Sequence, residues 1–202
     1  MIRKIFRKLI YFSNLFEVNP SFHDYPFGRE PLAGKDIYLE IWEKAKEKIY
    51  PVVDQYEKEN NFSIDINWFH ELALHTQVII KESNICYQHG RILYTKLSKY
   101  LQKLKRKEIN ILESGTARGF STICMAKALK DRGKNGKIIT IDPLPHNIKM
   151  YWNCIDDNDS IKTRNELLYN YKNLMEKYIT FHEGLSINVL KRLKMSRIHF
   201  SF

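Results

Sequence analysis

The sequence predicts an α/β fold in which a parallel sheet is flanked by helices and preceded by a helical N-terminal extension. Short apolar runs of the kind that form buried parallel strands occur at 109–112, 138–142, 178–182 and 197–202. Segments with the 3.6-residue spacing of amphipathic helices separate these runs. Strands that alternate with helices in this way are typical of βαβ units, whose strands pair in parallel. We therefore expect residues 1–82 to form a helical extension or lid and residues 83–202 to form the sheet domain.

In the extension, Pro51 interrupts a helical pattern that runs from 37 to 56, and we expect it to kink or divide that helix. The next helix is expected to begin with Asp65 or Asn67 as its cap. Gly90 is expected to break the pattern ahead of an amphipathic helix at 92–104.

In the sheet domain, the sequence predicts a helix at 121–129 behind the first strand and a turn at 132–137. Ser160 is expected to cap the helix that follows the long segment 143–159. A short helix is predicted at 187–193, ahead of the fourth strand.

The composition is that of a folded domain with an excess of positive charge. Apolar residues make up 44% of the 202 residues and aromatic residues 13%, which is enough for a packed core and argues against a disordered chain. The formal net charge is +10, which suggests an acidic partner such as a nucleic acid. Much of the excess lies at 3–8 and 96–107, however, and the second cluster has the pattern of a solvated helix face. A nucleic-acid partner is therefore the less favoured alternative.

The cysteines and the lengths of the apolar runs indicate where in the cell the protein is located. Cys86, Cys124 and Cys154 are an odd number without C-x-x-C spacing, so we predict neither a disulfide framework nor a zinc site. Reduced thiols are typical of a cytoplasmic protein, which is the location we expect. No apolar run reaches the length of a membrane span. Residues 1–16 are basic and amphipathic but lack a signal-peptide cleavage site. We expect them to dock on the protein or to fray, and contact with a membrane surface or a nucleic acid is the less favoured alternative.

A glycine loop follows the first predicted strand and precedes a helix. Gly115 and Gly119 allow positive φ and the close approach of a ligand. The N–H groups at the start of the next helix favour a carboxylate or phosphate. Glu113, at the end of the strand, argues against a phosphate-rich ligand and for one that carries a positive charge. A ligand with a carboxylate, an amine and a ribose fits these features better than a pyrophosphate does.

This stretch, Leu-Glu-Ser-Gly-Thr-Ala-Arg-Gly-Phe-Ser-Thr at 112–122, resembles the first motif of class I S-adenosylmethionine-dependent methyltransferases. It is similar to the O-methyltransferase branch, which includes the catechol-type enzymes and relatives of cephalosporin hydroxylase. The resemblance implies a Rossmann-like fold, S-adenosylmethionine as cofactor and methyl transfer to an oxygen or nitrogen of a small molecule. The competing dinucleotide motif G-x-G-x-x-G would need a small residue at Phe120, which disfavours a nicotinamide-dependent oxidoreductase.

The resemblance also implies the cofactor-binding residues. Glu113 would face the methionine amine, Asp142 would accept the ribose hydroxyls, and the element after the third strand would lie beside adenine. An acidic residue that closes the second strand suits ribose recognition in nicotinamide enzymes as well, so Asp142 alone does not identify the cofactor. The complete predicted set is Glu113, Gly115, Thr116, Ala117, Gly119, Ser121, Thr122, Asp142, Gly184, Leu185 and Ser186. Leu185 stands where relatives often have Asp.

No catalytic residue follows from the sequence, and the candidates are two histidines. His89 directly precedes a Gly-Arg-x-Leu element, at 90–93, that the family places near the methionine end of the cofactor. His146 lies in the segment 143–159, which we expect to cover the cofactor or shape the acceptor pocket. Each of them also fits a structural role. Asp156 and Asp157 have the oxygen chemistry of a Mg²⁺ or Ca²⁺ site, but their spacing is not that of an EF-hand.

His70 and His75 have no partner at metal-ligand spacing, and we expect them to be structural or surface residues. In the family, the residues that would hold a divalent metal lie beyond the position of Phe202. The sequence therefore predicts no metal ligand within the chain.

The resemblance implies more strands than the sequence holds. We expect the strand order 3-2-1-4, with the fourth strand an unpaired apolar edge, and we expect the chain to be a fragment of a longer methyltransferase. Such an edge favours association, including homo-oligomers. A non-catalytic cofactor-binding or interaction module is the alternative function, and the methyl acceptor is not identified.

Overall fold

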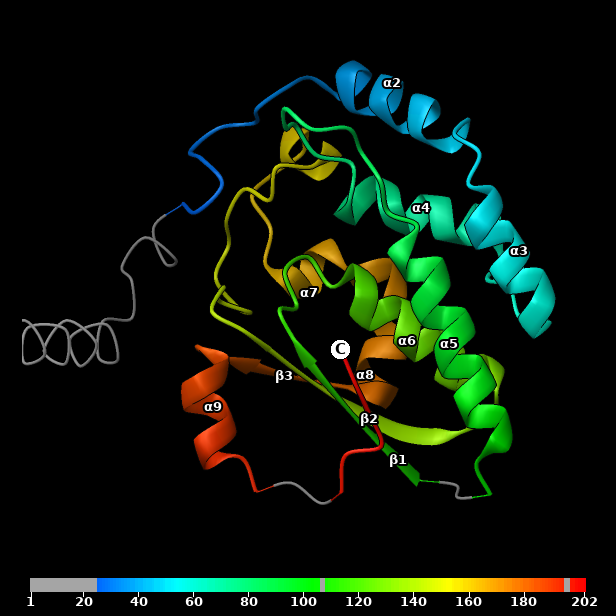
Figure 1. Ribbon diagram of the computed structural model, residues 1–202. Coiled ribbons are helices and arrows are strands. Elements are labelled where there is room, and N and C mark those ends of the chain that lie inside the picture. The colour runs from blue at the N-terminus through cyan, green and yellow to red at the C-terminus, as the bar shows by residue number, and fades with distance from the viewer. Residues whose placement is uncertain (1–24, 106–107, 195–196) are drawn as a thin grey trace, which may run out of the picture.

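The structure, a computed structural model, describes residues 25–105, 108–194 and 197–202. The basic segment 1–16 lies outside the described residues. Four parallel strands form one sheet in the order β3-β2-β1-β4, which confirms the predicted order and fold class (Figure 1). The strands are β1 (Glu108–Ser114), β2 (Asn135–Asp142), β3 (Ile179–Glu183) and β4 (Phe200–Ser201).

Helices surround this sheet and precede it. They are α2 (Lys35–Lys46), α3 (Pro51–Asn60), α4 (Ile66–Thr76), α5 (His89–Lys103), α6 (Phe120–Asp131), α7 (Arg164–Leu167), α8 (Lys172–Tyr178) and α9 (Ser186–Arg192), with short 3-10 helices η2 (Ile155–Asn158) and η3 (Tyr169–Tyr171). In Figure 1, α5, α6 and α8 stack above the sheet, and α9 is set apart from them below the strands. None of the helices of the described residues is long and apolar enough to cross a membrane.

The main core lies between the sheet and the helices α5, α6 and α8. Ile109, Ile111 and Ile138 alternate along their strands toward this side and are at most 1% exposed. Burial of each such side chain contributes about 1.5–3 kcal/mol. Phe69 and Leu72 of α4 belong to the same core, so the N-terminal helices pack against the sheet domain.

The predicted division of the first long helix is confirmed. α2 ends at Lys46, and Pro51 is the first residue of α3, where its missing N–H leaves no hydrogen bond unmade. Asp65 caps α4, because its side chain accepts a hydrogen bond from the Trp68 N–H.

Gly90 does not break a helix, as the sequence analysis expected, but lies in the first turn of α5. A Cβ there would lie 2.6 Å from the ring of Phe120 and 2.8 Å from that of Phe69. The absence of a side chain at Gly90 therefore allows α5 to pack closely against these two rings.

β2 begins earlier than predicted. Asn135, Gly136 and Lys137 pair with 108–110 of β1, and only residues 132–134 make the turn. A Cβ at Gly136 would lie 3.1 Å from the Ile109 carbonyl oxygen and 2.9 Å from Leu129. The glycine that suggested a turn is thus a small residue inside a strand.

Ser160 is not the cap that the sequence predicted. Thr163 caps α7 in a capping box, in which its hydroxyl accepts from the Glu166 N–H and the Glu166 carboxylate accepts from the Thr163 N–H. The predicted single helix is divided into α7, η3 and α8.

Candidate functional site

The three predicted cofactor-binding segments meet at the carboxyl edge of the sheet. The N–H of Gly115 donates to the Ile141 carbonyl at 2.8 Å, and the N–H of Gly184 donates to the Asp142 carbonyl at 2.8 Å. The hydroxyls of Ser114 and Ser186 lie 2.5 Å apart. Parallel strands end at one edge, so residues far apart in the sequence become neighbours there.

The glycine loop takes backbone conformations that favour glycine at both of its glycines. φ is +95° at Gly115 and +89° at Gly119. A Cβ on Gly115 would meet no atom within 4 Å, whereas a Cβ on Gly119 would lie 2.7 Å from Cδ1 of Leu168. Gly115 thus borders open space on the exposed side of the loop, and Gly119 allows the loop to pack on Leu168.

Glu113 lies beneath this loop and is fully buried. Its Oε2 accepts hydrogen bonds from the hydroxyl of Thr140 at 2.6 Å and from the hydroxyl of Thr122. Its Oε1 has no hydrogen-bond partner in the described part of the chain. Burial raises the pKa of the carboxyl to about 7, against the opposing effect of the two threonine hydroxyls. An unpaired buried carboxylate oxygen is costly, by about 1–3 kcal/mol, and a cationic ligand group would satisfy it.

Asp142 closes β2 and binds the glycine loop. Its Oδ2 accepts from the Ala117 N–H at 2.8 Å, and its Oδ1 accepts from the Leu144 N–H at 2.8 Å and from Nη2 of Arg164 at 3.3 Å. A carboxylate offers about four lone-pair positions, so about one remains for a ligand. Asp142 is buried, with 5% of the residue exposed, so a ligand could reach it only at this remaining position.

Arg164 is a site residue that sequence reasoning missed. It is 1% exposed, its Nε donates to the Ala117 carbonyl at 2.8 Å, and its Nη2 reaches Asp142. Burial lowers the pKa of the guanidinium, while Asp142 opposes that shift. Arg164 therefore clamps the glycine loop to the end of β2. No pattern in the sequence distinguishes this arginine from the solvated ones.

The remaining predicted cofactor residues divide between buried and open positions. Thr116 is buried, and its hydroxyl lies 2.5 Å from that of Thr140. Ser121 is half-buried in the first turn of α6. Leu185 is 37% exposed beside Gly184, where φ is +133°. An exposed leucine at this edge offers an apolar contact to a flat ring.

The two candidate catalytic histidines lie in apolar surroundings. His89 begins α5 and contacts the ring of Phe120 edge-on, with 5.1 Å between the ring centroids, and burial lowers its pKa. His146 stacks on Phe181 at 4.1 Å. Burial, followed by the charge of Arg164, lowers the pKa of His146 to about 4. Such an imidazole is neutral but weakly basic, which is unfavourable for a general base near neutral pH.

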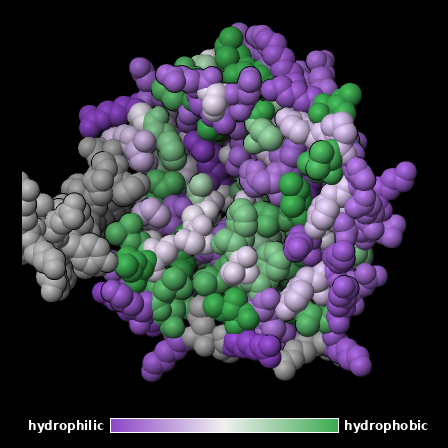
Figure 2. Space-filling view, viewed as in Figure 1, coloured by the Kyte–Doolittle hydropathy of each residue, from purple (hydrophilic) through white to green (hydrophobic). Residues whose placement is uncertain are grey.

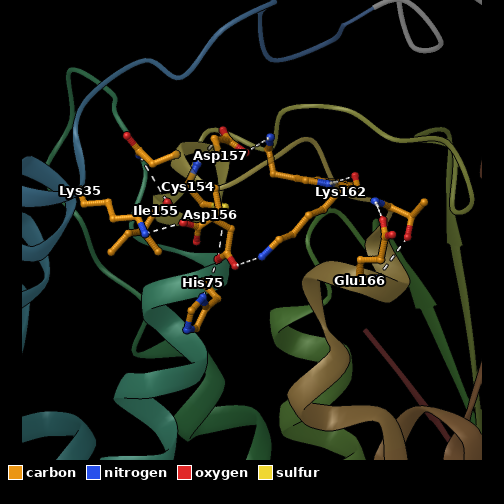
Figure 3. Close-up of polar contacts among 12 residues, drawn as sticks. Lys35, His75, Cys154, Ile155, Asp156, Asp157, Lys162 and Glu166 are labelled. Atoms are coloured by element: carbon orange, nitrogen blue, oxygen red, sulfur yellow. Dashed lines mark hydrogen bonds and ion pairs between the residues drawn. The ribbon is translucent and has the colours of Figure 1, made fainter.

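The acidic residues of the long segment form contacts within the protein. Asp157 accepts from the N–H groups of Trp152 and Cys154, and Asp156 contacts His75 and Lys162 (Figure 3). No group of three or more potential metal ligands gathers among the residues that the structure describes. His70 likewise contacts Tyr87, with Nδ1 2.8 Å from the phenol oxygen.

Residues 112–202 match a family described as a methyltransferase domain. The match contains the glycine loop, Asp142 and the segment 184–186. A comparison with curated proteins finds no match. This part of the chain is therefore similar to a methyltransferase domain, and its parallel sheet of order β3-β2-β1-β4 is Rossmann-like.

Three solved structures are similar to the chain at low identity. A putative O-methyltransferase from Klebsiella pneumoniae is 22% identical, with a TM-score of 0.36 over 76% of this chain and 52% of that one. Cofactor-bound Rv0187 from MTB is 17% identical, with a TM-score of 0.44 over 77% and 60%. The SAH-bound methyltransferase PaMTH1 from Podospora anserina is 16% identical, with a TM-score of 0.37 over 80% and 53%. The chain spans about half the length of these proteins.

Proposed function

We propose that the chain is an S-adenosylmethionine-dependent methyltransferase that acts on an oxygen or nitrogen of a small-molecule acceptor. The match of residues 112–202 to a methyltransferase domain carries this proposal. The glycine loop and the ends of β2 and β3, which the resemblance assigns to the cofactor, meet at one edge within the matched segment.

Two features of the described residues fit this cofactor. The unpaired Oε1 of Glu113 is suited to the ammonium of the methionine part, directly or through a water. The open space beside Gly115 leaves room for a ligand against the loop backbone. We assign the ribose to the remaining lone pair of Asp142 and the adenine to Gly184, Leu185 and Ser186.

When bound, the cofactor supplies a methyl group that its positively charged sulfur already activates. The residues of the chain then have to hold and orient the cofactor and exclude water from the reacting atoms. Glu113 fixes the charged end, and Arg164 and Asp142 hold the loop backbone at Ala117. We assign no general base, because His146 is weakly basic and burial lowers the pKa of His89 beside the ring of Phe120.

The proposal extends to the parts of the chain and its partners. We propose that residues 1–82 form a lid over the acceptor, that the protein is cytoplasmic, and that a small molecule is favoured over a nucleic acid as its partner. Association of two copies through the sheet would cover β4 and the exposed Ile187 and Leu190 of α9. Figure 2 shows apolar side chains gathered over α9 and over the centre of this face.

Formation of S-adenosylhomocysteine from S-adenosylmethionine, measured with a panel of catechols, alcohols and amines, tests the function. We expect turnover with at least one acceptor, and its loss in Gly115→Arg, which fills the open space. Gly133→Arg is the matched control, because Gly133 also has a positive φ and open space but lies in the turn before β2. Cofactor binding without any turnover would instead favour the alternative, a non-catalytic cofactor-binding module.

A further inference from the structure

A cavity of about 380 Å³ lies between the end of α4 and the segment that runs from η2 to η3. None of its lining residues belongs to the glycine loop or to the segment 184–186. It is lined by His75, Asp156, Lys162, Glu166, Leu167, Tyr169 and Asn170. Figure 3 shows His75 on one side of this space and Lys162 and Glu166 on the other. The volume falls at the lower end of the range of about 300–1,000 Å³ found for small-molecule sites.

The imidazole of His75 has a fixed orientation in this cavity. Its Nδ1 lies 2.5 Å from Oδ2 of Asp156. Hydrogen bonds from His75 and Lys162 lower the pKa of the Asp156 carboxyl in spite of its burial, so this carboxylate only accepts. Nδ1 must therefore carry the hydrogen, which leaves Nε2 as the ring atom that can hydrogen-bond to a ligand. Figure 3 shows the second ring nitrogen directed away from Asp156.

The charged side chains of the lining are paired, one of them with Lys149, which lies outside the lining. Nζ of Lys162 lies 2.6 Å from Oδ1 of Asp156, and Nζ of Lys149 lies 3.3 Å from Oε1 of Glu166. The ammonium of Lys162 has three donors and uses one of them on Asp156. A cavity with paired charges and free donors and acceptors favours a neutral polar ligand over an ion, because an ion would meet a like charge beside every opposite one.

Two exposed side chains complete the lining. The phenol ring of Tyr169 is 68% exposed and offers a flat apolar surface with a polar tip. Asn170 offers an amide that both donates and accepts. A sugar ring has the complementary chemistry, since its C–H faces pack on an aromatic ring while each hydroxyl donates and accepts a hydrogen bond.

We propose that this cavity binds a neutral saccharide of one or two rings. A ring hydroxyl hydrogen-bonds to Nε2 of His75, another accepts from Lys162, and the C–H face packs on Tyr169. Asn170 bonds a further hydroxyl. Aromatic and phosphorylated ligands are disfavoured, because the lining has one exposed ring only and two carboxylates.

Isothermal calorimetry of the full chain with glucose, galactose and maltose tests this site, with glucose 6-phosphate and phenol as comparison ligands. We expect a neutral sugar to bind with a Kd of about 1 mM and more tightly than either comparison ligand. The variants Tyr169→Ala and Asn170→Ala should each weaken binding about tenfold. Asn173→Ala is the matched control, because Asn173 is exposed on the neighbouring α8 and does not line the cavity.

A readout on the histidine separates binding at this site from binding elsewhere. In ¹⁵N spectra of the imidazoles, sugar should shift the Nε2 resonance of His75 and leave that of His182 in place. Absence of binding by all three sugars, tighter binding of glucose 6-phosphate or phenol, or an unshifted His75 would each overturn the proposal. S-adenosylmethionine binding by Tyr169→Ala should remain unchanged, which keeps this test independent of the proposed function.

Discussion

The buried carboxyl of Glu113 should make the stability of the protein depend on pH in a way that one substitution removes. Its pKa is raised from 4.5 to about 7 in the folded state. Below pH 4.5 the carboxyl is protonated in the folded and unfolded states alike, so no buried charge lowers the free energy of unfolding. As the pH rises through 7, the unfolded state has already lost the proton and folding must bury the charge. Stability therefore falls between these pH values.

The size of this effect follows from the shift. The pKa of the carboxyl is about 2.5 higher in the folded state than in the unfolded state. At about 1.4 kcal/mol for each pKa unit, the free energy of unfolding falls by about 3 kcal/mol between pH 4.5 and pH 7.5. Glu113→Gln replaces the carboxyl by a neutral group of the same shape, whose oxygen can still accept from Thr122 and Thr140. This variant should lack that loss.

Urea unfolding followed by circular dichroism at a series of pH values measures the difference. The free energy of unfolding of Glu113→Gln, relative to that of the unaltered chain, should rise by about 3 kcal/mol across this interval. Glu176→Gln is the control, since Glu176 is exposed on α8. The free energy of unfolding of this variant, relative to that of the unaltered chain, should not change with pH across the interval. A flat difference for Glu113→Gln would refute the reasoning, because it would mean that the carboxyl titrates normally in the folded state.

Three further substitutions test the packing that supports the site. Gly119→Ala should lower stability by about 1–3 kcal/mol, because the added Cβ would meet Leu168 and φ at this position is positive. Thermal melting measures this loss, which should be smaller when Leu168 is also replaced by alanine. Gly90→Ala should cost about 1–3 kcal/mol in urea unfolding, because its Cβ would enter the rings of Phe69 and Phe120; an unchanged midpoint would contradict the packing described. Arg164→Met should cost about 3–5 kcal/mol and speed amide exchange at Ala117, whereas unchanged exchange would show that Arg164 does not hold the loop.

The sheet and the glycine loop could be predicted from the sequence because their signals are local. Four apolar runs separated by helical spacing imply a parallel sheet, and Gly115 and Gly119 mark the loop after the first strand. Parallel strands end at one edge, so the meeting of Glu113, Asp142 and Gly184 follows from topology alone.

The interactions that hold the loop could not be predicted because they depend on tertiary contacts. Arg164 is a polar residue in a polar stretch, and only the folded chain places its side chain against Ala117 and Asp142. Gly90 and Gly136 resemble helix and strand breakers in the sequence, yet each is a small residue where a neighbouring element comes close. The choice of Thr163 over Ser160 as a cap depended on Glu166 at the third position of the helix.

The hydrogen-bond partners of the Glu113 carboxyl could not be predicted from the sequence either. Thr122 and Thr140 have no special spacing relative to Glu113, but strand register and the first turns of α6 bring all three together. The long segment 143–159 was expected to cover the cofactor. In the structure this segment is held to the glycine loop, since Nε of Arg118 donates a hydrogen bond to the carbonyl of Trp152. Its role toward a ligand stays a prediction.

Calorimetric titration with S-adenosylmethionine, S-adenosylhomocysteine and NAD tests the central claim most directly. We expect the first two to bind with Kd values of about 1–100 μM, binding to be lost in Gly115→Arg and retained in Gly133→Arg, and NAD not to bind. Binding of NAD in their place, or equal binding by both glycine variants, would contradict the assignment of the glycine loop as the S-adenosylmethionine site.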